Sequence, residues 1–292
     1  MKNGKIISSY MDIEVYRKSF NELAKNTFGL NFEEWYQNGY LGDKYIAYSY
    51  LQDDKIIANV SVNKMNLVMD GKIKKAIQIG TVMTDSKYRN MGLAAKLMNH
   101  VIQKYENSCD LIYLFANDSV LEFYPKFGFE KISENSYEME AKDIKRKVVP
   151  IKRLDIKNEN DRENIKRLVQ NRKPISEKLG IINDQWPLLV YCLYEYRNDM
   201  YYLMEDDSIV IARRNDHTLH LYDIISQKPI NLDDVLEKVV REEDERVQFY
   251  FIPKKSKYNV MRGVAERIDD TLFVRTKDPL CDEILFPMTS HT

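Results

Sequence analysis

The stretch from Ile79 to Ala94 constrains the fold of this chain most strongly. It starts as an apolar strand, passes through a polar loop and a glycine, and opens the most regular amphipathic helix of the sequence, predicted over Leu93–Glu106. Apolar residues recur at every fourth position of this helix, at Leu93, Leu97, Val101 and Tyr105. A fully apolar strand, 111–116, follows, and this order of strand, helix and strand indicates an α/β fold.

The start of that helix is a candidate anion site. Backbone N–H groups at a helix start have no partner within the helix, and the helix dipole places about half a positive charge there. Gly92 lets the main chain approach an anion closely, and Arg89 and Lys87 add full positive charges. Such a site suits a phosphate or diphosphate. Neither GxxxxGK[ST] nor GxGxxG occurs, which argues against a P-loop and a Rossmann dinucleotide site.

Composition excludes several classes of protein. Hydrophobic residues make up 44% of the 292, which is enough apolar material for a core and excludes a disordered chain. The 44 basic and 45 acidic residues leave a net charge of -1, so we expect neither nucleic acid nor a membrane as a partner. The first residues lack the apolar segment of a secretory signal, and we expect a cytoplasmic protein.

No metal site is expected. The 3 cysteines are widely spaced and form no CxxC pair. His217 and His220 are neighbours among the 4 histidines, but their spacing along a predicted strand points the two side chains to opposite faces.

A charged run, 142–147, closed by Pro150 divides the chain into predicted domains of 1–142 and 150–292. Asp12 is expected to cap the first helix. The first domain is expected to contain helices at 12–28, 32–36, 93–106 and 119–124 and strands at 44–51, 55–62, 75–84, 111–116 and 128–139. The second is expected to contain helices at 159–170, 185–196 and 232–241 and strands at 200–204, 208–214, 218–226 and 247–252. The predicted helices and strands follow a similar order in the two domains, which indicates a diverged internal repeat. The alternative is the general likeness among α/β domains.

Two signatures resemble those of the Gcn5-related N-acetyltransferase (GNAT) superfamily. Val82-x-Thr84 followed by Arg89-x-x-Gly92-x-Ala94 and a helix is similar to its motif A. Downstream, Asn117 is followed by Phe-Tyr and Gly-Phe pairs, as in the family's second signature. The resemblance covers about residues 1–140 and implies an α/β (α+β) fold with a mixed, mostly antiparallel GNAT sheet flanked by helices. A degenerate second GNAT-like domain would follow, as in the first two domains of Eis-type acetyltransferases.

The resemblance implies that acetyl-CoA is the cosubstrate and assigns residues to it. Val82, Met83 and Thr84 would pair with the pantetheine arm through their backbones. Asn117 and Phe123 would border the pantetheine and the thioester. The diphosphate would lie in a cradle formed by Arg89, Asn90, Met91, Gly92, Leu93 and Ala94.

The implied activity is direct transfer of the acetyl group to a primary amine, which is either a small molecule or a peptide. The N–H of Met83 would hold the tetrahedral oxyanion, and Tyr124 would protonate the leaving thiolate. Pro125 departs from the family pattern, because proline disfavours helical geometry in the residue before it.

The general base is open, because the third strand carries Gln78 where many relatives carry a glutamate. In Eis-type enzymes the carboxyl terminus reaches the active site as the base. The candidates are Asp85, Glu33, Glu34, His291 and the Thr292 carboxylate.

The second half is not expected to bind the cofactor, because it has no Arg-x-x-Gly and because Asp233 and Asp234 would repel a diphosphate. Its aromatic residues, among them Trp186, Tyr191 and Tyr194, are assigned to its core. The alternatives to an enzyme of this kind are a non-catalytic acyl-CoA sensor and a transferase that uses aminoacyl-tRNA. A homo-oligomer is left open.

Overall fold

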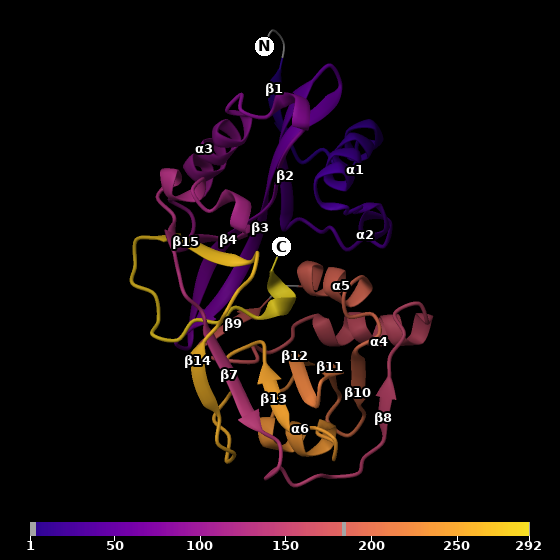
Figure 1. The fold of residues 1–292 in the computed structure, drawn as a ribbon. Helices are drawn as coiled ribbons and strands as arrows, with labels where there is room; N and C mark the ends of the chain where they lie inside the picture. Colours follow the sequence, from indigo (N-terminus) through magenta and orange to yellow (C-terminus); the bar gives the residue numbers. More distant parts are fainter. Residues whose placement is uncertain (1–3, 183–184, 292) are drawn as a thin grey trace.

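The computed structural model describes residues 4–182 and 185–291. The chain forms two β-sheets that follow one another along the long axis of the molecule, with helices packed against them (Figure 1). Within this part of the chain, no helix is both long enough and apolar enough to cross a membrane.

The first sheet carries helices on both faces (Figure 1). Helix α3 (Leu93–Tyr105) covers one face, while α1 (Glu14–Phe28) and α2 (Glu33–Gln37) lie on the other. Among its described strands only β4 and β5 pair in parallel, which confirms the predicted mixed, mostly antiparallel sheet. Its strands in order are β1 (Lys5–Ser8), β2 (Tyr45–Gln52), β3 (Lys55–Met69), β4 (Lys72–Thr84), β5 (Leu111–Ala116), β15 (Thr271–Thr276) and β6 (Glu130–Lys131), with β9 (Leu179–Ile182) paired to β3.

The second sheet repeats the central pattern of the first. Strands β12 and β13 pair in parallel and are connected by α6 (Leu232–Val239), as β4 and β5 are connected by α3. Helices α4 (Glu159–Val169) and α5 (Gln185–Leu193) complete this half. Its strands in order are β14 (Met261–Val264), β7 (Asn135–Glu140), β13 (Arg246–Phe249), β12 (Thr218–Ser226), β11 (Ser208–Asn215), β10 (Met200–Leu203) and β8 (Ile151–Arg153).

Each half of the chain, on either side of the charged run 142–147, contributes strands to the sheet formed mainly by the other half. The strand expected at 128–139 is two strands, because β6 stays in the first sheet while β7 pairs with β13 and β14 of the second. In return, the second half supplies β9 and β15 to the first sheet. Between β6 and β7 lies Glu134, which is buried and accepts hydrogen bonds from the Arg267 side chain and the Phe286 N–H. An alternation of apolar residues indicates a strand but does not predict which strand it pairs with.

Three local expectations differ from the structure. The first helix begins at Glu14 without a side-chain cap, because Asp12 accepts a hydrogen bond from Tyr36 instead. The helix expected at 119–124 is replaced by two 3₁₀ turns, η2 (Asp118–Val120) and η3 (Tyr124–Phe127). The sequence also gave no signal for five short strands, β1, β8, β9, β14 and β15.

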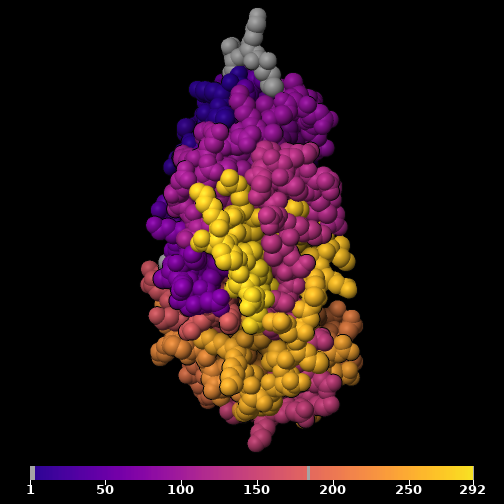
Figure 2. Space-filling model, turned by 90° about the vertical axis from the view of Figure 1, so that its left-hand side faces the viewer, coloured from indigo at the N-terminus to yellow at the C-terminus, as the bar shows by residue number. Residues whose placement is uncertain are grey.

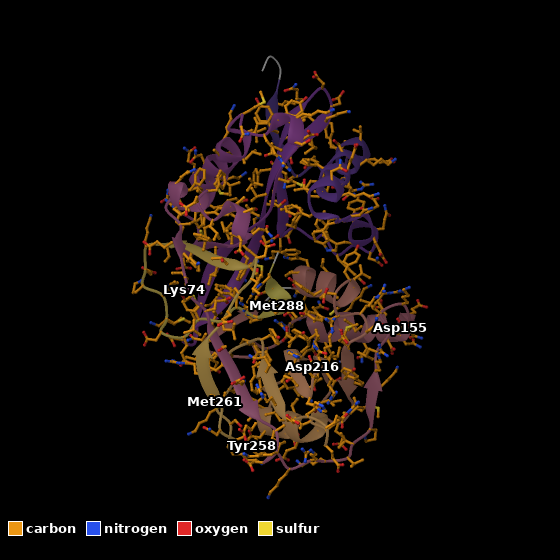
Figure 3. The ribbon with its side chains drawn as sticks, viewed as in Figure 1. Lys74, Asp155, Asp216, Tyr258, Met261 and Met288 are labelled. Atoms are coloured by element: carbon orange, nitrogen blue, oxygen red, sulfur yellow. The ribbon has the colours of Figure 1, made fainter. Side chains whose placement is uncertain are left out.

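The C-terminal segment, residues 284–291, returns to the first sheet. Figure 2 shows the yellow end of the chain lying against the purple and magenta N-terminal part, and Met288 lies where the two sheets meet (Figure 3). Phe286 stacks on Tyr113 with ring centroids 4.5 Å apart. Thr289 donates to Asp223 at 2.5 Å, and Asp223 forms a buried ion pair with Arg172 at 2.8 Å. These long-range contacts fix the end of the chain between the sheets.

Candidate functional site

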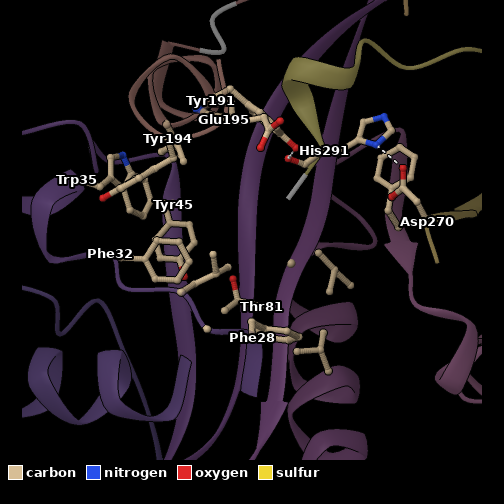
Figure 4. A pocket seen from close by; sticks show the side chains of 18 of the residues that line it. Phe28, Phe32, Trp35, Tyr45, Thr81, Tyr191, Tyr194, Glu195, Asp270 and His291 are labelled. Carbon is tan, nitrogen blue, oxygen red and sulfur yellow. Dashed lines mark hydrogen bonds and ion pairs between the residues drawn. The ribbon is translucent and has the colours of Figure 1, made fainter. Parts of the chain in front are cut away.

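A cavity of about 760 Å³ opens where β4 and β5 stop pairing (Figure 4). Their parallel ladder ends at Ile79 and Leu114, although β4 continues to Thr84 and β5 to Ala116. The wall takes residues from 28–35, 79–82, 115–124, 186–195 and 269–270, together with Tyr45 and His291. Both halves of the chain therefore build the cavity.

A bulge in β4 shapes the edge of this opening. Thr81 has a φ of 49°, in the left-handed region that a β-branched residue rarely adopts, and the register to β3 shifts beside it. The buried side chain of Asn59 on β3 donates to the Thr81 carbonyl at 2.8 Å and to Ser61 Oγ at 2.8 Å. Its own Oδ1 accepts from Ser49 Oγ at 2.7 Å. The hydrogen bonds around Asn59 thus hold the strained turn in place.

The bulge is followed by the backbone segment expected to contact the pantetheine arm. The N–H of Asp85 donates to the carbonyl of Ile57 on β3 at 2.9 Å. Because N–H groups alternate along a strand, the N–H of Met83 also faces β3, whereas those of Val82 and Thr84 face the gap beside β5. Val82 lines the cavity and the Met83 side chain is buried. The geometry therefore favours Val82 over Met83 as the donor to an oxyanion.

The cradle lies at the exposed start of α3. Gly92 has a φ of 76°, which favours glycine, and a Cβ built there would meet no atom within 4 Å. Arg89, Asn90 and Met91 are exposed, and the Arg89 side chain donates a hydrogen bond to the Thr84 carbonyl at 3.4 Å. Leu93 is buried under the helix and Ala94 is half-buried. This open, cationic helix start fits a diphosphate.

Tyr124 lies in the cavity wall, in the first turn of η3. Pro125 lies in the first turn of this 3₁₀ helix, where proline is tolerated. The proline therefore does not interrupt the helical turn that starts at Tyr124. The ring packs against Phe129 and Phe273, and burial raises the pKa of the hydroxyl to about 12. The phenol is therefore protonated at neutral pH, as a general acid requires.

Asn117 also lines the cavity, whereas Phe123 lies behind Tyr124 and packs on it at 5.3 Å. The Asn117 amide donates to Asp269 at 2.9 Å, and the N–H of Asp118 donates to the same carboxylate at 2.8 Å. These two hydrogen bonds lower the pKa of Asp269 below its usual range. They also fix the loop after β5 against the strand that arrives from the second half.

Most of the base candidates lie outside the cavity. Glu33 pairs with Arg17 at 3.1 Å, Glu34 lines a separate hollow, and Asp85 accepts from the Lys87 N–H at 2.9 Å. His291 lines the cavity, and Thr292 lies outside the described residues. Of the candidates that the structure describes, His291 is thus the one in the wall.

His291 is held by three contacts (Figure 4). Its ring stacks on Phe115 at 3.6 Å between centroids, its Nδ1 lies 3.0 Å from Asp270 Oδ2, and its carbonyl accepts from the Tyr191 hydroxyl at 2.7 Å. Burial alone would raise the pKa of the Asp270 carboxyl, but the hydrogen bond to His291 and the positive charge of Arg267 lower it below its usual range. Sequence reasoning missed Asp270, which has no local pattern around it.

Gln78 has a structural role at the place where relatives carry a glutamate. It is fully buried on β4, and its Nε2 donates to the carbonyl of Ser290 at 2.7 Å. The residue therefore anchors the C-terminal segment beside the cavity.

Three aromatic residues of the second half were assigned to its core, but Trp186, Tyr191 and Tyr194 also line the cavity. Trp186 packs against Trp35 at 5.6 Å, across the boundary between the halves. Their pattern in the sequence is that of an ordinary apolar helix, so only the docking of α5 on α2 reveals the second role.

The start of α6, the helix equivalent to α3, is filled by the chain itself. Asn231 caps it through the Asp234 N–H, Asp233 accepts from Ser256 at 2.5 Å, and Asp234 pairs with Lys147 at 2.7 Å. A diphosphate would meet carboxylates there. In the described part of the chain, no group of three or more histidine, cysteine or acidic side chains is arranged to hold a metal ion.

In comparison with known proteins, the first half matches a family model, and the likeness of fold extends to nearly the whole chain. Residues 12–132 match the family model described as acetyltransferase (GNAT) domain. The curated protein N-alpha-acetyltransferase 50 of Danio rerio is 38% identical over 64 residues, which are 20% of this chain and 38% of that protein. This chain thus matches well under half of the length of that relative.

Two crystal structures share the fold over 94% of this chain. A probable N-acyltransferase from Enterococcus faecalis V583 has a TM-score of 0.61 at 17% identity, with 72% of its chain covered. Eis1 from Mycobacterium abscessus has a TM-score of 0.59 at 14% identity, with 74% of its chain covered. At such identities the likeness establishes the fold alone.

Proposed function

Because residues 12–132 belong to the GNAT acetyltransferase family, we propose that this protein transfers an acetyl group from acetyl-CoA directly to a primary amine. One observation carries the proposal. The cavity opens where β4 and β5 stop pairing and is lined by Val82, Asn117 and Tyr124, and the exposed start of α3 follows the loop after β4. The order of these features supports the proposal, because acyl transfer from a thioester of CoA needs a site for the diphosphate, room for a narrow arm and an acid for the leaving thiolate.

Acetyl-CoA would bind through this chain's backbone for most of its length. The N–H groups of Gly92, Leu93 and Ala94 would hold the diphosphate, assisted by Arg89. The pantetheine arm would then lie along β4, where the N–H groups of Val82 and Thr84 face the gap. Its thioester would reach the cavity beside Asn117.

Acetyl transfer requires a neutral amine, because an alkylammonium has no free electron pair. The amine nitrogen attacks the thioester carbonyl carbon and forms a tetrahedral oxyanion, to which the N–H of Val82 is the proposed donor. The carbon–sulfur bond then breaks, and Tyr124 donates its proton to the sulfur. The nitrogen, which is positively charged after the attack, loses its second proton to water, and the phenolate recovers a proton from that water.

The proposed acceptor of the amine proton is the pair formed by Asp270 and His291, acting directly or through a water molecule. Both residues line the cavity, and Asp270 precedes Thr271, which pairs with Ala116. That register places Asp270 beside Asn117, at the end of the cavity where the thioester would lie. The Asp270 carboxylate would bind the ammonium and accept its proton, and the Nδ1–H of His291 would hold that carboxylate in position.

The second half would complete the acceptor side rather than bind a second cofactor, since carboxylates fill the start of α6. We retain as part of the proposal a catalytic domain of 1–142 and a degenerate GNAT-like domain of 150–292 that share strands, in a cytoplasmic enzyme. This proposed arrangement resembles that of the first two domains of Eis-type enzymes.

The test is release of free CoA from acetyl-CoA over a panel of primary amines. Arg89→Ala should weaken the binding of CoA, measured by titration. Tyr124→Phe should preserve binding and lower turnover. CoA binding without release by any amine would instead support the acyl-CoA sensor, and an absence of CoA binding would refute both functions.

A further inference from the structure

The cavity has an aromatic end and an acidic end. At the aromatic end, α1, α2, β2 and α5 bring together the aromatic wall (Phe28, Phe32, Trp35, Tyr45, Trp186 and Tyr194). Trp35 lies 5.0 Å from Tyr45 and 5.6 Å from Trp186 between ring centroids, so the rings form one continuous surface. In Figure 4, Phe32, Trp35, Tyr45 and Tyr194 lie on one side of Thr81, and Asp270 and His291 lie on the other.

Negative charge is concentrated in the lining. Asp269, Asp270 and Glu195 contribute carboxylates, and none of the described lining residues is a lysine or an arginine. Glu195 pairs with Arg213 at 3.3 Å outside the cavity, whereas Asp270 is bound within the wall by His291. A cationic group would therefore be most stable near Asp270, beside the place of acetyl transfer.

The tyrosine hydroxyl groups of the cavity lining at positions 45, 191 and 194 are already hydrogen-bonded within the protein. The indole N–H groups of Trp35 and Trp186, unpaired within the described residues, are buried out of reach of solvent. Tyr45 bonds with Ser61 Oγ at 2.7 Å, Tyr191 donates to the His291 carbonyl at 2.7 Å, and Tyr194 donates to the Asn31 carbonyl at 3.4 Å. A ligand rich in hydroxyl or amino groups would lose its water there without gaining matching partners, which is unfavourable. An apolar or aromatic ligand body loses nothing comparable and gains contact with the rings.

We infer that the acceptor is an arylalkylamine, a primary ammonium on a short chain that carries an aromatic body, with its amine at Asp270 and its ring against the aromatic wall. This inference rests on the proposed acetyl transfer and names its substrate class. Such a molecule matches both ends of the cavity, because the single charge meets the carboxylate and the ring meets Trp35, Trp186 and Tyr194. Polyamines and aminoglycosides would place further charges or hydroxyl groups against the apolar end.

The test compares kcat/KM for 2-phenylethylamine, methylamine, spermidine, kanamycin and a short peptide with a free N-terminus, measured as CoA release. For 2-phenylethylamine we expect a value at least about tenfold above those of the others, since one good aromatic contact is worth about that factor. Tyr194→Ala should lower it about tenfold for 2-phenylethylamine and leave methylamine unchanged. Tyr194→Phe should retain the preference. The matched control is Tyr201→Ala on β10, outside the cavity, which should leave kcat/KM unchanged for both 2-phenylethylamine and methylamine.

Calorimetry of 2-phenylethylamine binding to the CoA-loaded protein distinguishes failure of the proposed acetyl transfer from failure of the proposed ligand class. Binding without turnover of any amine would refute the proposed enzyme but keep the ligand class. Faster turnover of spermidine, kanamycin or the peptide would overturn the inference and leave the acetyltransferase standing. If 2-phenylethylamine does not bind and no amine is turned over, both the proposed enzyme and the proposed ligand class are refuted.

Discussion

Asn59 offers the most direct link between the fold and the proposed chemistry. Its side chain makes three buried hydrogen bonds, one from Ser49 and two to Ser61 and the Thr81 carbonyl. Each is worth about 1 kcal/mol net, so Asn59→Ala should lower the free energy of unfolding by about 3 kcal/mol. Relaxation of the left-handed conformation of Thr81 would offset part of this loss, since that conformation costs about 1–3 kcal/mol and persists only while its surroundings hold it.

The same substitution should affect turnover. Thr81 precedes Val82, the proposed oxyanion donor, so relaxation of the bulge would move that N–H away from its position. We expect kcat to fall at least about tenfold, less than the 10²–10³-fold typical of losing such a donor completely, while KM for acetyl-CoA changes little. Asn59→Asp should be at least as destabilising as Asn59→Ala, because a carboxylate there would face the Thr81 carbonyl without a donor.

Urea unfolding followed by fluorescence gives the stability change, and CoA release gives kcat and KM. The matched control is Asn66→Ala on the same strand, because the half-buried Asn66 side chain has no hydrogen-bond partner within the described residues. Its change should stay within about 0.5 kcal/mol. The proposed role of Asn59 would be contradicted if Asn59→Ala lowers the free energy of unfolding no more than Asn66→Ala does, or if KM rises while kcat is unchanged.

Three further predictions test separate parts of the structure. Tyr124→Phe should lower kcat by about 10²–10⁴-fold without weakening CoA binding, since a general acid contributes about that factor, and an unchanged rate would remove it as the acid. Gln78→Ala removes the hydrogen bond to the Ser290 carbonyl and should accelerate limited proteolysis of the C-terminal segment, seen by mass spectrometry; equal rates in both proteins would contradict the anchoring role. Hydrogen bonds from Lys147, Lys257 and Tyr258 lower the pKa of Glu237 from 4.5 to about 2. This group therefore stabilises the folded state above pH 4.5, and the contribution disappears as the pH falls to about 2, so Glu237→Gln should flatten the acid side of the stability profile and a slope like that of the parent would refute the assignment.

The resemblance to a known family and the local elements could be predicted from the sequence to a useful extent. The strand Leu111–Ala116 agrees with its prediction, and α3 ends one residue before the predicted end. The glycine at position 92 has the left-handed φ that a turn into a helix requires. Such features depend on residues near each other in the chain, where periodicity, glycine and capping act directly.

The sequence alone determined the strand, glycine turn and helix of the cradle, because those residues are neighbours and their geometry is local. Only the tertiary structure decided which strands pair, that Gln78 holds a carbonyl 212 residues away, and that Asp270 and Trp186 share a cavity with Tyr124. The physical reason is that strand partners and cavity walls are chosen by burial and hydrogen bonding between distant segments. No periodicity within one segment records what will pack against it.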